Sequence, residues 1–227
     1  MVLEDVVQDF NLRERTQVFK DRRDAGGALA ESLLEYASTD VVVMAIPSGG
    51  VPVAAEICQM LSLKMDVLVV RKVQFPKDSE AGFGAVGPND IIVLNDYLIE
   101  SARLSHVVTE GQIAKARMGL NFREQMFRGG EPYPDLGGKT VILVDDGLAS
   151  GFTMLAAIKF VRSKGARKVV VAVPTGSERS VELVLEQADE VHCLNIRSAP
   201  FYAVADAYKH WYDVSEEEAL AIIRSRA

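Results

Sequence analysis

Apolar runs rich in β-branched residues recur along the chain and alternate with stretches of helical pattern. The apolar runs lie at residues 41–46, 66–70, 91–94, 140–144, 168–173 and 190–194. Continuous apolar strands of this kind are typical of a parallel sheet that is covered on both faces. Between the runs, apolar residues recur at spacings of three and four, which predicts helices at residues 22–36, 51–63, 110–128, 152–164 and 178–187. This alternation predicts a doubly wound α/β fold whose mostly parallel central sheet has about five strands.

Two segments interrupt the alternation. Residues 74–90 contain two prolines, three glycines and mixed charge, which predicts a loop long enough to be mobile or functional. Residues 198–213 are rich in aromatic side chains and follow the last clear strand. The sequence shows no repeats and no linker that would divide it. We therefore expect a single domain over residues 1–227, with a core at about 22–195 and a small hood built from about 1–21 and 196–227.

The charge balance of the chain argues against one class of partner. The 227 residues include 25 basic and 32 acidic side chains, which gives a formal charge of −7. Broad binding to DNA or RNA needs clustered Lys and Arg, so we expect no nucleic-acid partner and infer that local groups hold any anionic ligand. No apolar run approaches the roughly 18 residues of a membrane span, and the acidic start does not resemble a secretory signal. Cys58 and Cys193 are far apart and fit a reducing compartment. We expect a cytoplasmic protein with no membrane partner.

The most informative motif covers residues 141–154, where a buried strand ends at two carboxylates and a short hydroxyl-bearing loop begins a helix. Backbone N–H groups at a helix start, the positive end of the helix dipole and the hydroxyls of Ser150 and Thr153 can together hold a phosphate. Alternatively, Ser150 only caps the helix, and Asp145 and Asp146 end the strand in solvent. Two adjacent carboxylates beside an anion site are electrostatically unfavourable unless a ligand supplies both phosphate and hydroxyl groups, or a metal. The pattern therefore favours a functional site.

This motif resembles the signature of the type I phosphoribosyltransferases, which is a β-strand, two acidic residues and a Thr/Ser-Gly-x-Thr loop that holds phosphoribosyl pyrophosphate. The resemblance implies that Asp145 and Asp146 are catalytic residues that face the ribose 2- and 3-hydroxyls. It implies a 5-phosphate site formed by Ala149, Ser150, Gly151, Phe152 and Thr153. Departure of pyrophosphate leaves positive charge on the sugar, which nearby carboxylates stabilise. Magnesium is the expected cofactor, carried mainly by pyrophosphate oxygens and water, with Asp145 and Asp146 as mostly indirect ligands.

A second match lies at residues 45–56, again a strand, a glycine turn and a helix start. In similar proteins this turn contacts pyrophosphate, which implies that role for Ser48, Gly49 and Gly50. Judged alone, the segment also fits an ordinary strand-to-helix turn rich in glycine. Many similar proteins carry Arg or Lys where this chain has Ser48. The loss of a charge-assisted contact there either weakens pyrophosphate binding or requires other side chains to supply that contact.

A third match is an Arg-Lys pair that ends a predicted strand just before residues 74–90. In similar transferases such a loop closes over the substrate, and its cations meet pyrophosphate. The resemblance therefore implies catalytic roles for Arg71, Lys72 and Lys77. Closure would exclude water from a reactive sugar cation. Alternatively, Arg71 and Lys72 form the solvated end of an edge strand.

The aromatic segment after the last strand offers one further candidate. Some members of the family stack a base on an aromatic residue placed here, and Tyr202 is the best match for this acceptor-stacking role. Ordinary hydrophobic packing of the C-terminal tail explains the segment equally well.

Together the matches predict a phosphoribosyltransferase of nucleotide and nucleoside metabolism that uses phosphoribosyl pyrophosphate and a small nitrogenous acceptor. In the 6-oxopurine transferases the fifth signature position is an acidic general base, whereas this chain has Ala149. The missing base argues against hypoxanthine or guanine and leaves adenine-type, orotate-type and unusual acceptors open. The alternative is a non-catalytic regulatory protein that senses phosphoribosyl pyrophosphate or a nucleotide, and a hydrolase of the phosphorylated sugar is a third option. Similar enzymes often dimerise, so the resemblance allows a homodimer.

Overall fold

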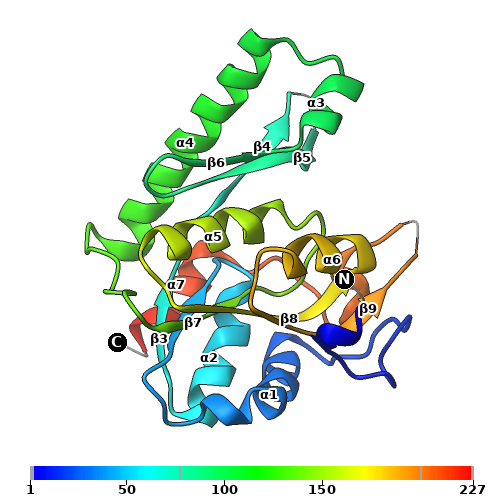
Figure 1. Ribbon diagram of the computed structural model, residues 1–227, viewed down its shortest axis with the longest axis vertical. Coiled ribbons are helices and arrows are strands. Elements are labelled where there is room, and N and C mark those ends of the chain that lie inside the picture. The colour runs from blue at the N-terminus through cyan, green and yellow to red at the C-terminus, as the bar shows by residue number, and fades with distance from the viewer. Residues whose placement is uncertain (1–2, 77, 200, 226–227) are drawn as a thin grey trace.

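A six-stranded parallel sheet forms the centre of the molecule in the computed structural model, which describes residues 3–76, 78–199 and 201–225. The strands run in the order β1-β9-β8-β7-β2-β3, and every neighbouring pair is parallel (Figure 1). Their bounds are β1 Val6–Val7, β2 Val42–Ala45, β3 Lys64–Val67, β7 Thr140–Val144, β8 Lys168–Ser177 and β9 Glu190–Arg197. The predicted doubly wound parallel sheet is confirmed. The two-residue β1, too short to leave a sequence pattern, forms one edge.

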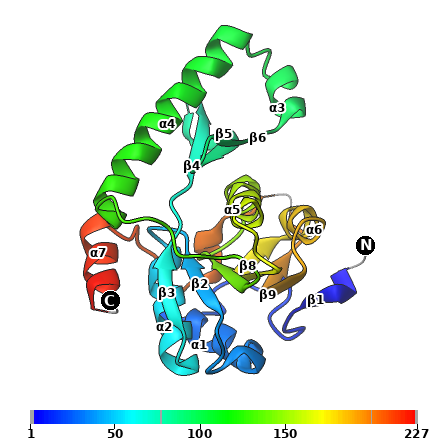
Figure 2. The same ribbon diagram turned by 60° about the vertical axis from the view of Figure 1, so that its left-hand side comes forward.

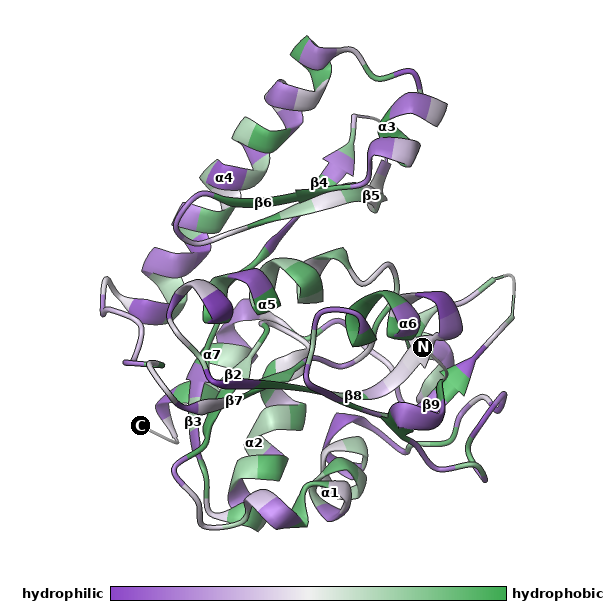
Figure 3. Cartoon of the chain, in the orientation of Figure 1, coloured by the Kyte–Doolittle hydropathy of each residue, from purple (hydrophilic) through white to green (hydrophobic). Residues whose placement is uncertain are grey.

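Helices cover both faces of this sheet, α1 and α2 on one face and α5 and α6 on the other (Figure 1). Their bounds are α1 Arg22–Ser32, α2 Gly50–Leu61, α5 Phe152–Ser163 and α6 Glu178–Leu185. The strands are apolar on both sides, as the continuous runs predicted. In β2, the buried Val43 belongs to the core shared with α1 and α2, and the buried Met44 belongs to the core shared with α5. Figure 3 shows the same pattern in β8, much of which has the green of hydrophobic residues.

A three-stranded antiparallel sheet with the order β4-β5-β6 lies beyond α5 in Figure 1. It and the helices that follow it have the bounds β4 Arg71–Phe75, β5 Asp78–Gly87, β6 Ile91–Leu94, α3 Asp96–Ser101 and α4 His106–Arg128. Figure 2 shows α4 running from the far end of this region down to α7 (Glu216–Arg224). No described helix, α4 included, has the length and apolar character needed to cross a membrane.

Two predictions for this region are wrong. Residues 74–90 form most of a β-hairpin rather than a loop, and residues 91–94 form an antiparallel strand rather than a strand of the main sheet. The glycines that suggested a loop instead let the strands approach, because a Cβ at Gly84 would overlap the carbonyl oxygen of Val93. Phe83 beside it is fully buried. Burial of this ring stabilises the hairpin, and local composition does not reveal that burial.

Parts of the two terminal segments, which we expected to form the hood, lie side by side at residues 17–20 and 206–210. The backbone N–H group of Gln17 donates to the carbonyl oxygen of Asp206 at 2.7 Å, and that of Phe19 donates to the carbonyl oxygen of Ala207 at 3.0 Å. Residues far apart in the sequence are thereby joined by backbone hydrogen bonds, next to the helix start at Arg22.

An ionic cluster links the amino ends of β8 and β9 to the segment after α1. Glu190 accepts a hydrogen bond from Oη of Tyr36 at 2.8 Å, forms an ion pair with Lys168 and lies 2.5 Å from Nε2 of the buried His192. Nζ of Lys168 also donates to Oη of Tyr36 at 2.7 Å. Burial by itself would raise the pKa of Glu190, but the hydrogen bonds from Lys168, His192 and Tyr36 outweigh it and lower the pKa to about 2.

Glu190→Gln is expected to lower the free energy of unfolding at pH 7 by about 1–3 kcal/mol, because Lys168 and Tyr36 lose a charged partner. The contribution of Glu190 to the free energy of unfolding is fully present above its ordinary pKa of 4.5. It is lost as the pH falls towards the lowered pKa of about 2. Urea unfolding of both proteins across this range should show the difference shrinking with falling pH. The same substitution at the exposed Glu186 is the control. Equal stability of the wild type and Glu190→Gln at pH 7 would contradict the prediction.

Candidate functional site

The glycine turn after β2 and the two carboxylates after β7 lie side by side, because β2 and β7 are neighbours in the sheet. Ala45 lies opposite Val144, and the N–H group of Ile46 donates to the carbonyl oxygen of Val144 at 2.8 Å. A Cβ at Gly49 would overlap the carboxylate of Asp146, so only glycine permits this approach. The structure therefore brings the two strongest sequence motifs to one edge of the sheet.

Asp145 and Asp146 are crowded acids in a partly enclosed position. The N–H group of Asp146 donates to Oδ1 of Asp145 at 2.8 Å, and the Asp146 side chain is 15% exposed. Burial, followed by the charge of Asp146, raises the pKa of Asp145 well above its usual range. Burial also raises the pKa of Asp146, against the opposing effect of Arg22. A cation bound here would lower both pKa values and relieve the crowding.

Arg22 is a site residue that the sequence analysis missed. It begins α1, and its Nε donates to Oδ2 of Asp146 at 2.9 Å. Its Nη1 donates to the carbonyl oxygen of Tyr212 at 2.8 Å, and its guanidinium lies over the Trp211 ring, 4.0 Å from the centroid. Oη of Tyr208 donates to the backbone oxygen of Asp146 at 2.6 Å. The terminal segments thus hold one of the two carboxylates in a defined orientation. The sequence signal of Arg22, a basic residue at the start of a predicted helix, is shared by many surface arginines.

The loop predicted to bind the 5-phosphate is open at the start of α5. Ala149 and Ser150 are exposed, while the N–H group of Leu148 donates to the carbonyl oxygen of Thr175 at 2.9 Å and so attaches the loop to β8. Gly151, in the left-handed region at φ 80°, is the residue at which α5 starts, and no side chain accepts a hydrogen bond as its cap. The alternative in which Ser150 caps the helix is therefore wrong. The N–H groups of the first turn are left to a ligand or to water.

Two cavities adjoin this loop. One, of about 680 Å³, is lined by Ser150 and Phe152 at the start of α5 and by residues 94–98, which run from the end of β6 into α3. The other, of about 620 Å³, is lined by Ala149 and Tyr202, among others. The exposed Ala149 and Ser150 are therefore reachable from these cavities. Gly151 is buried, with Ser180 and Leu183 of α6 within 3.5 Å of the place where its Cβ would lie.

Tyr202 lines the second cavity and is also tied to the fold. Its Oη donates to Oγ1 of Thr175 at 3.1 Å, and the Arg197 guanidinium lies 5.3 Å from its ring centroid. Burial raises the pKa of the Tyr202 hydroxyl, which is therefore neutral at pH 7. The half-buried ring fits both the packing of the tail and a wall for an acceptor, so acceptor stacking stays a prediction.

Arg71 and Lys72 begin β4 and point to different neighbours. The Arg71 guanidinium lies against α4, where a Cβ at Gly119 would be 3.4 Å from its Nε. The stem of Lys72 crosses β5 at Gly82, where a Cβ would overlap it. The structure therefore separates two residues that the sequence analysis treated as a pair. Lys77, the third predicted cation, lies outside the described residues.

Ser48 contacts a cation that the sequence analysis also missed. Nη2 of Arg123, on α4, donates to Oγ of Ser48 at 2.9 Å. Nε of the same guanidinium lies 3.4 Å from Oε1 of Glu216 on α7. Arg123 is 75 residues from Ser48 in the sequence, within a helix that carries several other basic residues, so no local pattern distinguishes it.

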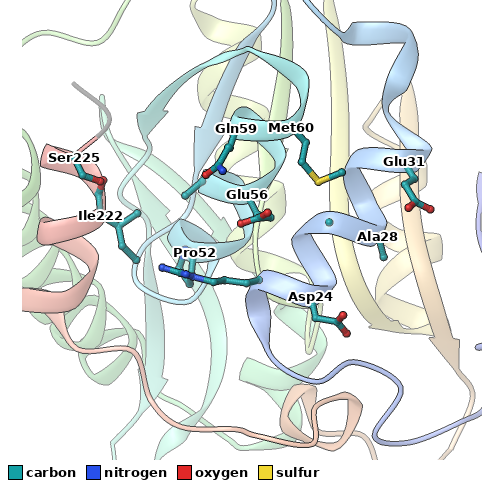
Figure 4. Close-up of a pocket in the computed structure, with 12 residues that line it drawn as sticks. Asp24, Ala28, Glu31, Pro52, Glu56, Gln59, Met60, Ile222 and Ser225 are labelled. Carbon is teal, nitrogen blue, oxygen red and sulfur yellow. The ribbon is translucent and has the colours of Figure 1, made fainter.

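A further groove, of about 710 Å³, lies between α1, α2 and α7 (Figure 4). It contains none of the residues predicted for the site. Asp24, Glu31 and Glu56 line it, and Arg23 is its one basic side chain among the described residues. This excess of carboxylates disfavours an anionic ligand. Binding of a phosphorylated substrate is therefore more favourable at the sheet edge formed by β2 and β7 than in this groove.

Comparison with known proteins identifies the family. The phosphoribosyl transferase domain family matches residues 16–213, which include the acidic pair, the glycine turn and the loop at the start of α5. The chain belongs to this family. A Mycobacterium tuberculosis protein named "Putative phosphoribosyl transferase MT0597" is 39% identical over 207 residues, or 91% of this chain. The match covers 46% of that protein, so the chain spans about half the length of the relative.

Solved structures agree with the family assignment. TT1426 from Thermus thermophilus is 38% identical with a TM-score of 0.74, and the match covers 92% of this chain and 99% of that one. AQ2163 from Aquifex aeolicus, at 14% identity and a TM-score of 0.50 over 82% of this chain and 78% of its own, shares the fold alone. The resemblance to type I phosphoribosyltransferases, and the fold that it implied, are confirmed. The roles of the individual site residues stay predictions.

Asp145→Asn is expected to raise the free energy of unfolding at pH 7 by about 1 kcal/mol, or the Tm by about 2–4 °C, because a buried carboxylate crowded by a second one destabilises the fold. Folding raises the pKa of Asp145, so its ionisation costs stability. The gain from the substitution should therefore be present at pH 7 and disappear as the pH falls through the ordinary pKa of 3.8. Thermal unfolding at pH 7 and below pH 3.8 measures the difference in Tm between the variant and the wild type. Asp40→Asn, at a side chain that is 89% exposed, is the control. A Tm at pH 7 no higher than that of the wild type would count against the prediction.

Proposed function

We propose that the chain transfers the phosphoribosyl group of phosphoribosyl pyrophosphate to a nitrogenous, nucleobase-like acceptor and releases pyrophosphate. The observation that supports this most directly is the arrangement at the edge of the sheet. The starts of α2, at Gly49, and of α5, at Gly151, both lack a side-chain cap among the described residues. They lie on either side of the carboxylates of Asp145 and Asp146, because the glycine turn follows β2 on one side of β7, whereas the loop before α5 pairs with β8 on the other side. Two anion sites with an acidic pair between them suit a sugar that bears phosphate at one end and pyrophosphate at the other.

In this reaction the bond between C1 of the ribose and the pyrophosphate oxygen breaks, and the leaving group keeps the electron pair. The acceptor nitrogen forms the new bond to C1 and loses its proton to pyrophosphate or water. Asp145 and Asp146 stabilise the positive charge that develops on the sugar. Arg22 holds the Asp146 carboxylate in place through its 2.9 Å hydrogen bond. The amides at the start of α5 hold the 5-phosphate.

Magnesium fits this site only as an ion shared with the substrate. Among the described residues, no group of three or more histidine, cysteine or acidic side chains could hold a metal ion. The donor set is the adjacent carboxylates of Asp145 and Asp146, whose crowding a cation would relieve. When bound, magnesium would offset the charge of the pyrophosphate oxygens, which are its preferred kind of ligand.

The second candidate function is a sensor that binds phosphoribosyl pyrophosphate or a nucleotide without chemistry. One departure from the family pattern favours it, namely Ser48 in place of a basic residue. A cytoplasmic location and a homodimer stay expectations that accompany either function.

Calorimetry and an assay of pyrophosphate release separate these functions. The chain is first titrated with phosphoribosyl pyrophosphate and magnesium, and release of pyrophosphate is then measured across a panel of purine, pyrimidine and other nitrogenous bases. Release that depends on one acceptor supports the transferase. Binding without release in any mixture leaves the sensor, and release without an acceptor indicates a hydrolase.

Asp146→Asn is expected to lower kcat at least about 100-fold, because an amide cannot stabilise the developing sugar cation as a carboxylate does. The amide oxygen can still accept the hydrogen bond from Arg22, so we expect the fold to persist, which circular dichroism checks. Steady-state assays with the acceptor found above measure the loss, with Asp40→Asn as the control. Unchanged kcat would remove Asp146 from the mechanism.

A further inference from the structure

Arg123 brings a positive charge to the glycine turn from a part of the chain that lies outside the parallel sheet. It is on α4, which follows the antiparallel sheet, and Figure 2 shows α4 descending towards α7. Its hydrogen bond to Ser48 places a guanidinium at the position of the turn where similar proteins carry a basic side chain of their own. A positive charge that the turn itself lacks is therefore supplied beside it by Arg123 of α4.

Arg123 differs from a purely structural arginine of the same helix. Arg128, 6% exposed, makes a two-pronged ion pair with Asp66 and also donates to the carbonyl oxygens of Val67 and Pro132. Arg123 is 13% exposed, and within the described part of the chain its side chain makes one hydrogen bond, to the hydroxyl of Ser48. Its Nε is buried without a hydrogen-bond partner among the described residues and has only the longer ion pair with Glu216. Buried guanidinium groups are normally hydrogen-bonded throughout, so Arg123 lacks the set of protein partners that a purely structural arginine has.

A second guanidinium lies next to it. Arg71 rests on α4 at Gly119, which is one turn before Arg123 on the same helix face. Burial, followed by the charge of Arg71, lowers the pKa of Arg123, while Glu216 opposes that effect. Ser48 and Gly49 of the adjoining turn are half-buried. Two cations that repel each other beside this turn form a site that a multiply charged anion would stabilise.

We propose that Arg123, together with Arg71, supplies the positive charge of the pyrophosphate subsite, in place of the basic residue that Ser48 replaces. This inference rests on the proposed function, because it assigns the turn to pyrophosphate. It gives α4 a direct part in substrate binding. It also makes Glu216 on α7 the carboxylate that holds Arg123 until the anion binds.

Calorimetric titration of the full chain with inorganic pyrophosphate, and separately with ribose 5-phosphate, tests the proposal. Arg123→Gln should weaken pyrophosphate binding at least about tenfold, because a charge-assisted contact to an ionised oxygen is lost. Binding of ribose 5-phosphate should stay within about twofold, since the start of α5 is untouched. Arg123→Lys should recover most of the loss. Arg117→Gln, on the same helix with a side chain 44% exposed, should match the wild type.

Several outcomes would overturn the proposal. Pyrophosphate affinity unchanged in Arg123→Gln would do so, as would an equal loss for both ligands or a failure of Arg123→Lys to recover binding. Glu216→Gln keeps the test decisive if Arg123→Gln does not fold. Removal of the competing carboxylate should leave pyrophosphate affinity unchanged or stronger, whereas a tenfold fall would show that Arg123 only connects α4 to α7.

The proposed function can fail separately. If the wild type binds pyrophosphate through Arg123 but releases none from phosphoribosyl pyrophosphate with any acceptor, the proposed transfer reaction is wrong and the proposed subsite is supported. If transfer occurs and Arg123→Gln retains the wild-type kcat/KM for phosphoribosyl pyrophosphate, the proposed subsite is wrong and the proposed transferase function is supported. A wild type that does not bind pyrophosphate would overturn the subsite itself.

Discussion

The pairing of β2 with β7 is the contact on which the site depends. Parallel strands end at the same edge of a sheet, so the register that sets Ala45 opposite Val144 also sets the glycine turn beside the acidic pair. The approach is so close that a side chain at Gly49 would displace the Asp146 carboxylate. Two motifs that are about a hundred residues apart thereby form one surface, with a helix start on each side.

The arrangement of charges at this edge of the sheet lowers the stability of the folded chain. Burial and the charge of Asp146 raise the pKa of Asp145, and burial and the charge of Arg71 lower the pKa of Arg123. Among the described residues, the counter-ion that contacts Asp146 is Arg22, and the one that contacts Arg123 is Glu216. Such unbalanced pairs are typical of sites whose ligand completes the electrostatics, because the ligand brings the opposite charges with it.

Local patterns were reliable where neighbouring residues carry the whole signal. The continuous apolar runs predicted the parallel strands because burial on both faces leaves no alternation, and Val43 and Met44 do face opposite cores. The same reasoning failed at residues 74–90, where glycine and proline suggested a loop. There the deciding facts are the burial of Phe83 and the close approach of Gly84 to β6, and both depend on what packs against the segment.

The sequence by itself determined the fold class, through the alternation of apolar runs and helical patterns along the chain. It also determined the family, because the acidic pair, the glycine turn and the loop before α5 each lie in a few consecutive residues. The tertiary structure alone decided which arginines serve the site. Arg22 is 124 residues from Asp146, and Arg123 is 75 residues from Ser48. An arginine on a helix looks the same in sequence whether it faces solvent or a buried acid. Only the tertiary packing of α1 and α4 gives these two arginines their partners.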